Sequence, residues 1–99
     1  MSNGLSEPLT PAAAKALIRV ILRSGTIDLS IPHAQLRMGQ RRMDALDVEN
    51  VLRAGGVEPG RKVRGSWRYR VATNRMVVVV RFRSPERLTI ITAWRKQRR

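Results

Sequence analysis

The sequence contains no cysteine, a single histidine and only seven acidic residues among its 99 residues. Without cysteine, the chain can form neither a disulfide nor a thiolate metal site. The few carboxylates are scattered, which argues against a metal-dependent nuclease, and one histidine excludes a catalytic histidine pair. The longest apolar run, MVVVV, is far too short to span a membrane, and the N-terminus lacks the features of a signal peptide. We therefore expect no cofactor or metal, no membrane partner and a cytoplasmic location.

Basic residues, in contrast, are abundant and unevenly placed. The chain carries 17 arginines and three lysines, for a formal net charge of +13. Residues 1–60 hold seven basic and six acidic side chains, a net charge of +1, whereas residues 61–99 hold thirteen basic and one acidic, a net charge of +12. Arginine makes bidentate contacts with phosphate that lysine cannot make. This charge pattern predicts a polyanionic partner.

The length fits one domain. We expect a flexible tail at residues 1–9, a single domain over residues 10–96 and a basic tail at residues 97–99.

Three helices are predicted in the first half of the chain. Thr10 as N-cap, Pro11 at the first helical position and Gly25 at the end predict a helix over residues 11–24. A second helix should run from the cap Ser30 to about Arg42, and a third over residues 45–54, between Asp44 and the Gly55–Gly56 pair. The apolar residues expected to face the core are Ala14, Leu17, Ile18, Ile21, Leu22, Leu46, Val48, Val51 and Leu52.

The second half of the chain changes to strand-like patterns. The runs SWRYRVA, MVVVVRFR and LTIITAWR are rich in Val, Ile, Thr and aromatic residues, and short connections separate them. Residues 26–29 are expected to form a brief extended connector and residues 55–65 a loop. The predicted class is α+β, with the N-terminal helices packed on an antiparallel sheet of three to four strands.

Alternation along these strands predicts which side chains share a face. Tyr69 and Val71 should face the helices, with Arg68 and Arg70 on the opposite face. On the last strand, Leu88, Ile90, Thr92 and Trp94 should share one face, opposite Thr89, Ile91, Ala93 and Arg95. The opposite face of the sheet can therefore hold a nucleic-acid backbone. The candidate nucleic-acid-binding residues are Arg42, Arg68, Arg70, Arg81, Arg83, Arg95 and Lys96.

The single histidine lies in a basic stretch. His33, Arg37 and Arg41 are spaced four residues apart, so in a helix they form one stripe. A helix N-terminus and neighbouring arginines both lower the pKa of an imidazole, which favours the neutral form that acts as a base. The simpler interpretation is also open: a lone histidine is often structural, and an arginine stripe is often a solvated face.

Cleavage of RNA without a metal needs a base for the 2′-hydroxyl, cations for the phosphorane charge and a proton donor. His33, Arg37 and Arg41 suit the first two roles. A hydroxyl such as that of Thr92 or Tyr69 suits the third.

The stretch HAQLRMGQR, followed by DVENVL, a Gly-rich loop, WRYRV, VVVVRF and TIITAWR, resembles a group of small bacterial domains of unassigned function. Their pattern is H-A-x-x-R-M-x-x-R, a second short helix and a meander that ends in a T-x-W/Y run. That group looks like a branch of the RelE/ParE-like toxin superfamily, within the barnase, EndoU, colicin and RelE-like ribonuclease fold. The resemblance covers roughly residues 30–96.

The resemblance implies a RelE-like fold and a metal-independent endoribonuclease toxin that leaves 2′,3′-cyclic phosphate ends. It implies His33, Arg37 and Arg41 as motif residues, Thr92 as the hydroxyl of the last strand and Trp94 as the aromatic after it. RNA and an acidic antitoxin are the implied partners, with the ribosome and a second copy of the chain as further candidates. Two alternatives stay open: a non-catalytic nucleic-acid-binding module, and a ParE-like toxin that inhibits a protein target.

Overall fold

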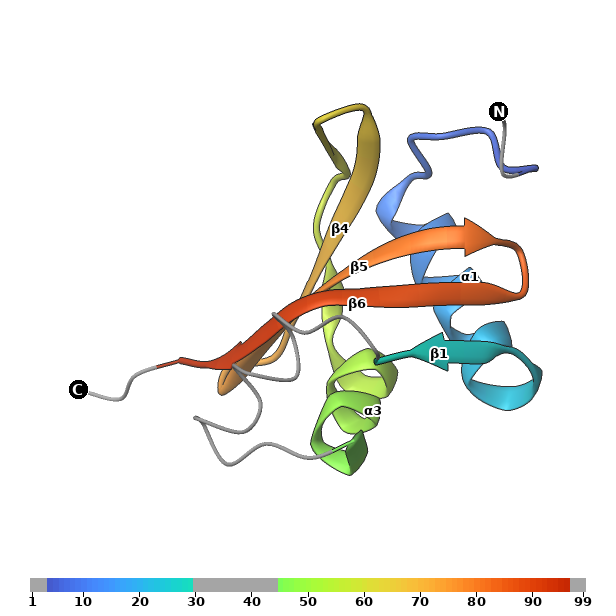
Figure 1. Cartoon of the computed structure of the whole chain (residues 1–99). Coiled ribbons are helices and arrows are strands. Elements are labelled where there is room, and N and C mark those ends of the chain that lie inside the picture. The colour runs from blue at the N-terminus through green and yellow to red at the C-terminus, as the bar shows by residue number, and fades with distance from the viewer. Residues whose placement is uncertain (1–3, 30–44, 97–99) are drawn as a thin grey trace.

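The computed structural model describes residues 4–29 and 45–96, which form an α+β fold (Figure 1). The described helices are α1 (Pro11–Ser24) and α3 (Ala45–Ala54). The described strands are β1 (Thr26–Asp28), β2 (Gly56–Val57), β3 (Arg61–Val63), β4 (Ser66–Ala72), β5 (Met76–Ser84) and β6 (Arg87–Arg95). The helix predicted over residues 30–42 lies outside the described residues. Among the described helices, none has the length and apolar character needed to cross a membrane.

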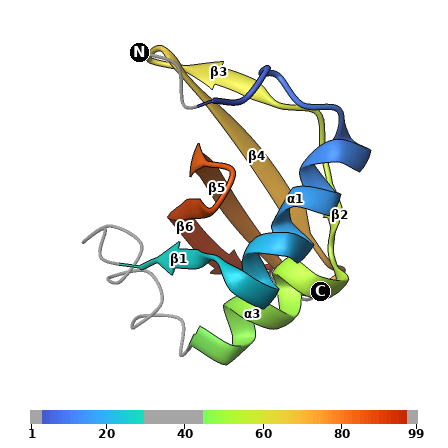
Figure 2. The same ribbon diagram turned by 90° about the vertical axis from the view of Figure 1, so that its right-hand side faces the viewer.

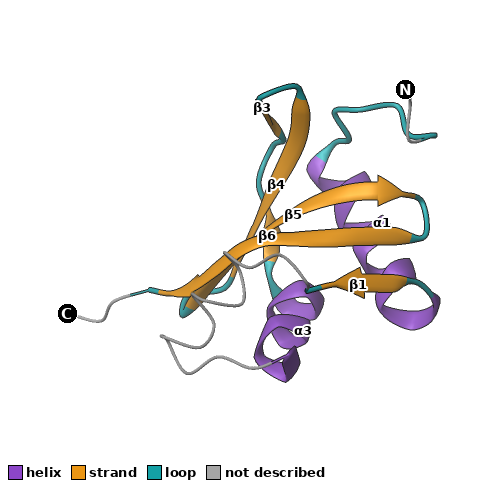
Figure 3. Ribbon diagram, in the orientation of Figure 1, coloured by secondary structure: helices purple, strands orange, loops and turns teal. Residues whose placement is uncertain are grey.

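The strands form one mixed sheet of six strands (Figure 3). The order along the sheet is β1-β6-β5-β4-β2, and β3 also pairs with β4. The predicted meander of β4, β5 and β6 is confirmed, and these neighbours are antiparallel. The prediction of a purely antiparallel sheet of three to four strands is wrong, because β1 pairs in parallel with β6. Strands as short as β1, β2 and β3 are too brief to show a period in the sequence.

Helix α1 begins and ends where its sequence signals predict. The Thr10 Oγ1 accepts a hydrogen bond from the Ala13 N–H at 3.1 Å, and Pro11 occupies the first turn, where no donor is needed. At the other end the Gly25 N–H donates to the Ile21 carbonyl at 2.8 Å. A Cβ at Gly25 would clash with the Glu86 carbonyl, so glycine is required where α1 leads into β1 beside the β5–β6 turn.

Both helices cover the same face of the sheet (Figure 2). Their buried residues are Ala14, Ile18 and Ile21 from α1 and Val48, Val51 and Leu52 from α3. These pack against a strand face that includes Tyr69, Val71, Val78, Val80, Phe82, Leu88 and Ile90. The prediction that Leu46 faces the core is wrong, since it is 61% exposed. It lies in the first turn of α3, outside the stripe that the later residues bury.

The segment before α1, predicted as a tail, lies against the core where it is described. Leu5 and Leu9 pack on the apolar cluster. The Leu9 N–H donates to the Tyr69 hydroxyl at 2.9 Å, and that hydroxyl donates to Glu7 Oε2 at 2.9 Å. Two hydrogen bonds thus tie this segment to β4.

Lys15 joins the two helices electrostatically. Its Nζ donates to the carbonyl oxygens of Leu52 at 3.1 Å, Arg53 at 2.8 Å and Gly55 at 2.6 Å. These carbonyls end α3, where acceptors lack partners within the helix and where the helix dipole favours a cation. Burial, with a smaller contribution from the nearby Arg19 charge, lowers the pKa of Lys15. The ammonium group therefore acts as a cap supplied by the neighbouring helix.

Replacing Lys15 with methionine should lower the free energy of unfolding by about 1–2 kcal/mol, because the side chain keeps its length but leaves three carbonyls without this donor. Urea denaturation followed by circular dichroism measures the change. Arg19→Met is the matched control, since Arg19 is exposed on the same helix and its loss should cost less than about 0.5 kcal/mol. Equal effects of the two substitutions would show that the cap contributes nothing specific.

Candidate nucleic-acid interface

The sheet face that points away from α1 and α3 carries arginine side chains. Arg68 and Arg70 alternate with the buried Tyr69 and Val71 on β4. On β5, Val79 and Arg81 alternate with the core residues in the same way. Arg70 pairs with Val79, and Val79 pairs with Thr92 on β6, so these three residues form one row across the sheet. We call this surface the arginine face.

A β-bulge determines what β6 contributes to this face. Val79 pairs with Thr92 whereas Val80 pairs with Ile90, so Ile91 is an extra residue on β6. The alternation reverses there: Leu88, Ile90 and Ala93 are fully buried in the core, whereas Thr92 and Trp94 lie on the arginine face. The prediction that Thr92 and Trp94 share a face with Leu88 and Ile90 is therefore wrong.

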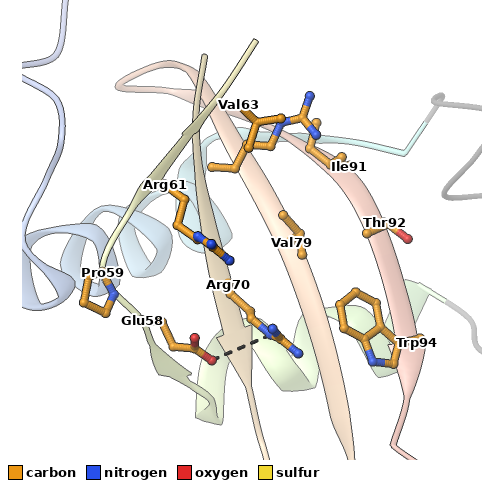
Figure 4. Close-up of a pocket in the computed structure, with 10 residues that line it drawn as sticks. Glu58, Pro59, Arg61, Val63, Arg70, Val79, Ile91, Thr92 and Trp94 are labelled. Atoms are coloured by element: carbon orange, nitrogen blue, oxygen red, sulfur yellow. Dashed lines mark ion pairs between the residues drawn. The ribbon is translucent and has the colours of Figure 1, made fainter. Parts of the chain in front are cut away.

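A pocket of about 260 Å³ is hollowed into the arginine face (Figure 4). Val79 and Ile91 supply apolar surface, and Trp94 lies at one end (Figure 4). The described residues that line it are Glu58, Pro59, Arg61, Val63, Arg68, Arg70, Val79, Ile91, Thr92 and Trp94. These described residues bring three arginines and one carboxylate to a partly apolar pocket, so their net charge is positive.

The guanidinium of Arg70 is held in place from two sides. Its Nε lies 3.7 Å from Glu58 Oε2, and its Cζ lies 5.2 Å from the centre of the Trp94 ring (Figure 4). The Glu58 N–H also donates to the Arg70 carbonyl at 2.9 Å, which fixes the carboxylate beside β4. Both side chains of the ion pair are about half exposed, so the pair adds little stability. The effect of the ion pair and of the Trp94 ring is to orient the Arg70 guanidinium within the pocket.

In the part of the chain that the structure describes, two side-chain atoms of residues that line the pocket have no hydrogen-bond partner. They are Arg68 Nε and Thr92 Oγ1, and both are shielded from solvent. A buried donor without a partner costs about 1–3 kcal/mol, so each such atom in a native structure needs an explanation. That both line one pocket indicates a site whose ligand supplies the missing partners.

The candidate site residues are distributed unevenly. Arg68, Arg70 and Thr92 line the pocket. Arg81 is half-buried further along β5, and Arg83 and Lys96 are exposed. Four further candidates, His33, Arg37, Arg41 and Arg42, lie outside the described residues.

Arg95 was predicted to lie on the arginine face, and this placement is wrong. Beyond the bulge Arg95 follows Trp94 and turns to the helix side, where its Nη2 lies 3.5 Å from Asp47 Oδ2 of α3. The charged pocket residues that sequence reasoning missed are Glu58 and Arg61, which come from a segment predicted as a loop. The charged residues clustered in that predicted loop were the only feature of the sequence that could have indicated their part in a site.

Tyr69 lies on the helix-covered face, with its side chain fully buried, and does not line the pocket. Its hydroxyl accepts from Leu9 and donates to Glu7, as described above. Burial, together with the Glu7 carboxylate, raises the pKa of Tyr69 to about 12, and the hydrogen bond from Leu9 partly opposes this. The geometry assigns this hydroxyl to the attachment of the N-terminal segment.

The family described as a domain of unknown function (DUF4258) matches residues 32–95. The chain belongs to this family. The DUF4258 match includes every described residue that lines the pocket, whereas α1 and β1 precede it. No curated protein and no solved structure matches the chain.

Because the pKa of Tyr69 is raised in the folded state, ionisation favours unfolding. The stability that this group contributes is complete below about pH 10 and should be lost as the pH rises from about 10 to about 12. Tyr69 is the single tyrosine, so the ultraviolet absorbance of tyrosinate measures its titration directly. Tyr69→Phe should remove this part of the pH dependence from urea denaturation curves. A phenol that titrates near pH 10 in the folded protein would contradict the assignment.

Proposed function

We propose that this protein binds RNA through the arginine face. The observation that supports this most directly is the convergence of Arg61, Arg68 and Arg70 on one pocket of the sheet. Arginine forks match the geometry of phosphate oxygens, and Trp94 adds an aromatic ring of the kind on which single-stranded bases stack. The net charge of +12 over residues 61–99 supplies long-range attraction for such a polyanion.

We further propose that the RNA is cleaved without a metal, in a RelE-like toxin that an acidic antitoxin neutralises in the cytoplasm. The support is the likeness of residues 30–96 to the RelE/ParE-like superfamily, together with the H-A-x-x-R-M-x-x-R motif. In this proposal His33 removes the 2′-hydroxyl proton. The 2′-oxygen then attacks phosphorus while arginines stabilise the phosphorane charge, and the Thr92 hydroxyl gives a proton to the leaving 5′-oxygen. An acidic antitoxin suits the same basic surface by charge complementarity.

The RNA-binding proposal predicts that Arg70→Gln weakens the binding of a single-stranded RNA and reduces the slope of log K against log salt by about 0.7, the value for one lost phosphate contact. Fluorescence anisotropy with a labelled RNA at several salt concentrations measures both quantities. Glu58→Gln should have the opposite effect on affinity, because it removes a carboxylate that lines the pocket.

Two charge-matched controls accompany these variants. Arg87→Gln and Glu86→Gln change exposed residues that do not line the pocket, so each should alter RNA affinity less than its partner variant does. If pocket and control variants behave alike, RNA is attracted only by the overall charge. If the wild-type protein does not bind RNA, the proposal fails.

The cleavage proposal predicts that purified protein cuts total RNA in the presence of EDTA and leaves 2′,3′-cyclic phosphate ends. His33→Ala should reduce the cleavage rate at least 100-fold, a typical loss when a general base is removed, while circular dichroism shows an unchanged fold. A rate that equals the wild-type rate would exclude His33 as the base. Binding without any cleavage product would instead identify a non-catalytic RNA-binding module.

A further inference from the structure

The pocket on the arginine face has more specific features than binding to a phosphate backbone requires. General attraction of RNA needs only exposed cations, and Arg83 already provides one on the same strand as Val79. The pocket instead combines a shielded guanidinium nitrogen, a shielded hydroxyl and apolar surface. These features suit a ligand that is part anion and part flat, weakly polar ring.

The two unpartnered atoms differ in what they recognise. Arg68 Nε belongs to a permanently charged group that can only donate, so an anionic oxygen satisfies it best. Thr92 Oγ1 both donates and accepts, so it suits a neutral polar atom such as a ribose hydroxyl or a base edge. They lie on β4 and β6, with β5 between them. A ligand that satisfies both must therefore extend across β5.

The space between them is apolar and small. Val79 lies between Arg70 and Thr92 in the row across the sheet, and Ile91 lies beside Thr92 on the same wall (Figure 4). At about 260 Å³ the pocket is slightly smaller than typical small-molecule sites of about 300 Å³ or more. This is room for one nucleotide unit but not for a run of stacked bases.

We propose that the pocket is a subsite for a single nucleotide. Arg68 and Arg70 hold its phosphate, Thr92 bonds a polar atom of its sugar or base, and the base lies against Val79 and Ile91. This inference rests on the proposed RNA-binding function and names the unit of RNA that the pocket takes. An internal nucleotide of an RNA strand and a free nucleoside monophosphate share this chemistry, and the experiment below separates the two sources.

Trp94 provides a local probe, because it lines the pocket and is one of only two tryptophans. In a Trp67→Phe background, the fluorescence of Trp94 is followed while each of the four nucleoside 5′-monophosphates is added at constant ionic strength. The proposal predicts that the fluorescence change saturates with each monophosphate. The monophosphates should bind more tightly than the nucleoside uridine, which has no phosphate, and more tightly than inorganic phosphate. Labelled RNA in a separate competition shows whether the same pocket holds an internal nucleotide.

Two substitutions test the individual contacts. Arg68→Gln should weaken binding of the monophosphates about tenfold or more, as expected for a hydrogen bond to a charged group. Thr92→Val should weaken binding about two- to tenfold while leaving the protein at least as resistant to urea, because the unpartnered hydroxyl is removed. Arg87→Gln is the control with the same charge change at an exposed residue that does not line the pocket, and it should alter monophosphate binding less than twofold.

The outcomes separate this proposal from the broader function. Monophosphates that bind no better than inorganic phosphate, or a Thr92→Val variant with unchanged binding, would overturn the subsite even if RNA still binds with a steep dependence on salt. Monophosphate binding that RNA does not displace would support a pocket for free nucleotides and would count against the proposed RNA-binding function. Displacement of the monophosphate by RNA supports both the nucleotide subsite and the proposed RNA-binding function.

Discussion

The register shift between β5 and β6 is the constraint on which the candidate site depends. One extra residue, Ile91, lets Ala93 face the core while Thr92 and Trp94 turn to the other side of the sheet. Without the bulge, a bulky indole would point at the helices in place of a methyl group, and the pocket would lose both its aromatic wall and its hydroxyl. Bulges often re-aim side chains in this way near functional sites.

The same sheet separates two kinds of chemistry by its two faces. On one side, aliphatic residues of α1 and α3 meet the strands in a continuous core, and the few polar groups there are paired: Lys15 with three carbonyls, Tyr69 with Glu7 and Leu9. On the other side, guanidinium groups surround a pocket, and two side-chain atoms of its lining residues have no partner among the residues that the structure describes. The contrast between satisfied and unsatisfied polar groups is what distinguishes the arginine face as a candidate for binding.

Local signals allowed a good part of this fold to be predicted. Thr10, Pro11 and Gly25 delimit α1 because capping depends on neighbouring residues alone. Strand β4 shows a clear period of two, and β5 and β6 are rich in β-branched residues. The placement of Arg68 and Arg70 followed from the same period.

The errors have equally local causes. In the run Ile90–Ile91–Thr92, residues of similar shape suit either face of a sheet, so nothing in the sequence marks the bulge. Glu58 and Arg61 enter the pocket through strand pairings of two or three residues, which depend on contacts with distant β4. Sequence reasoning could thus find the arginines of the pocket on β4 but not its opposite wall.

The burial of α1 has a consequence for how the family can vary. Ala14, Ile18 and Ile21 complete the core over the sheet, yet they lie before the region that matches DUF4258. The matching region taken alone would leave part of its apolar face in water. A relative that shares only this region must therefore cover that face with a different element or with a partner chain. Part of the hydrophobic core of this protein is therefore supplied by a helix that lies outside the region shared with the family.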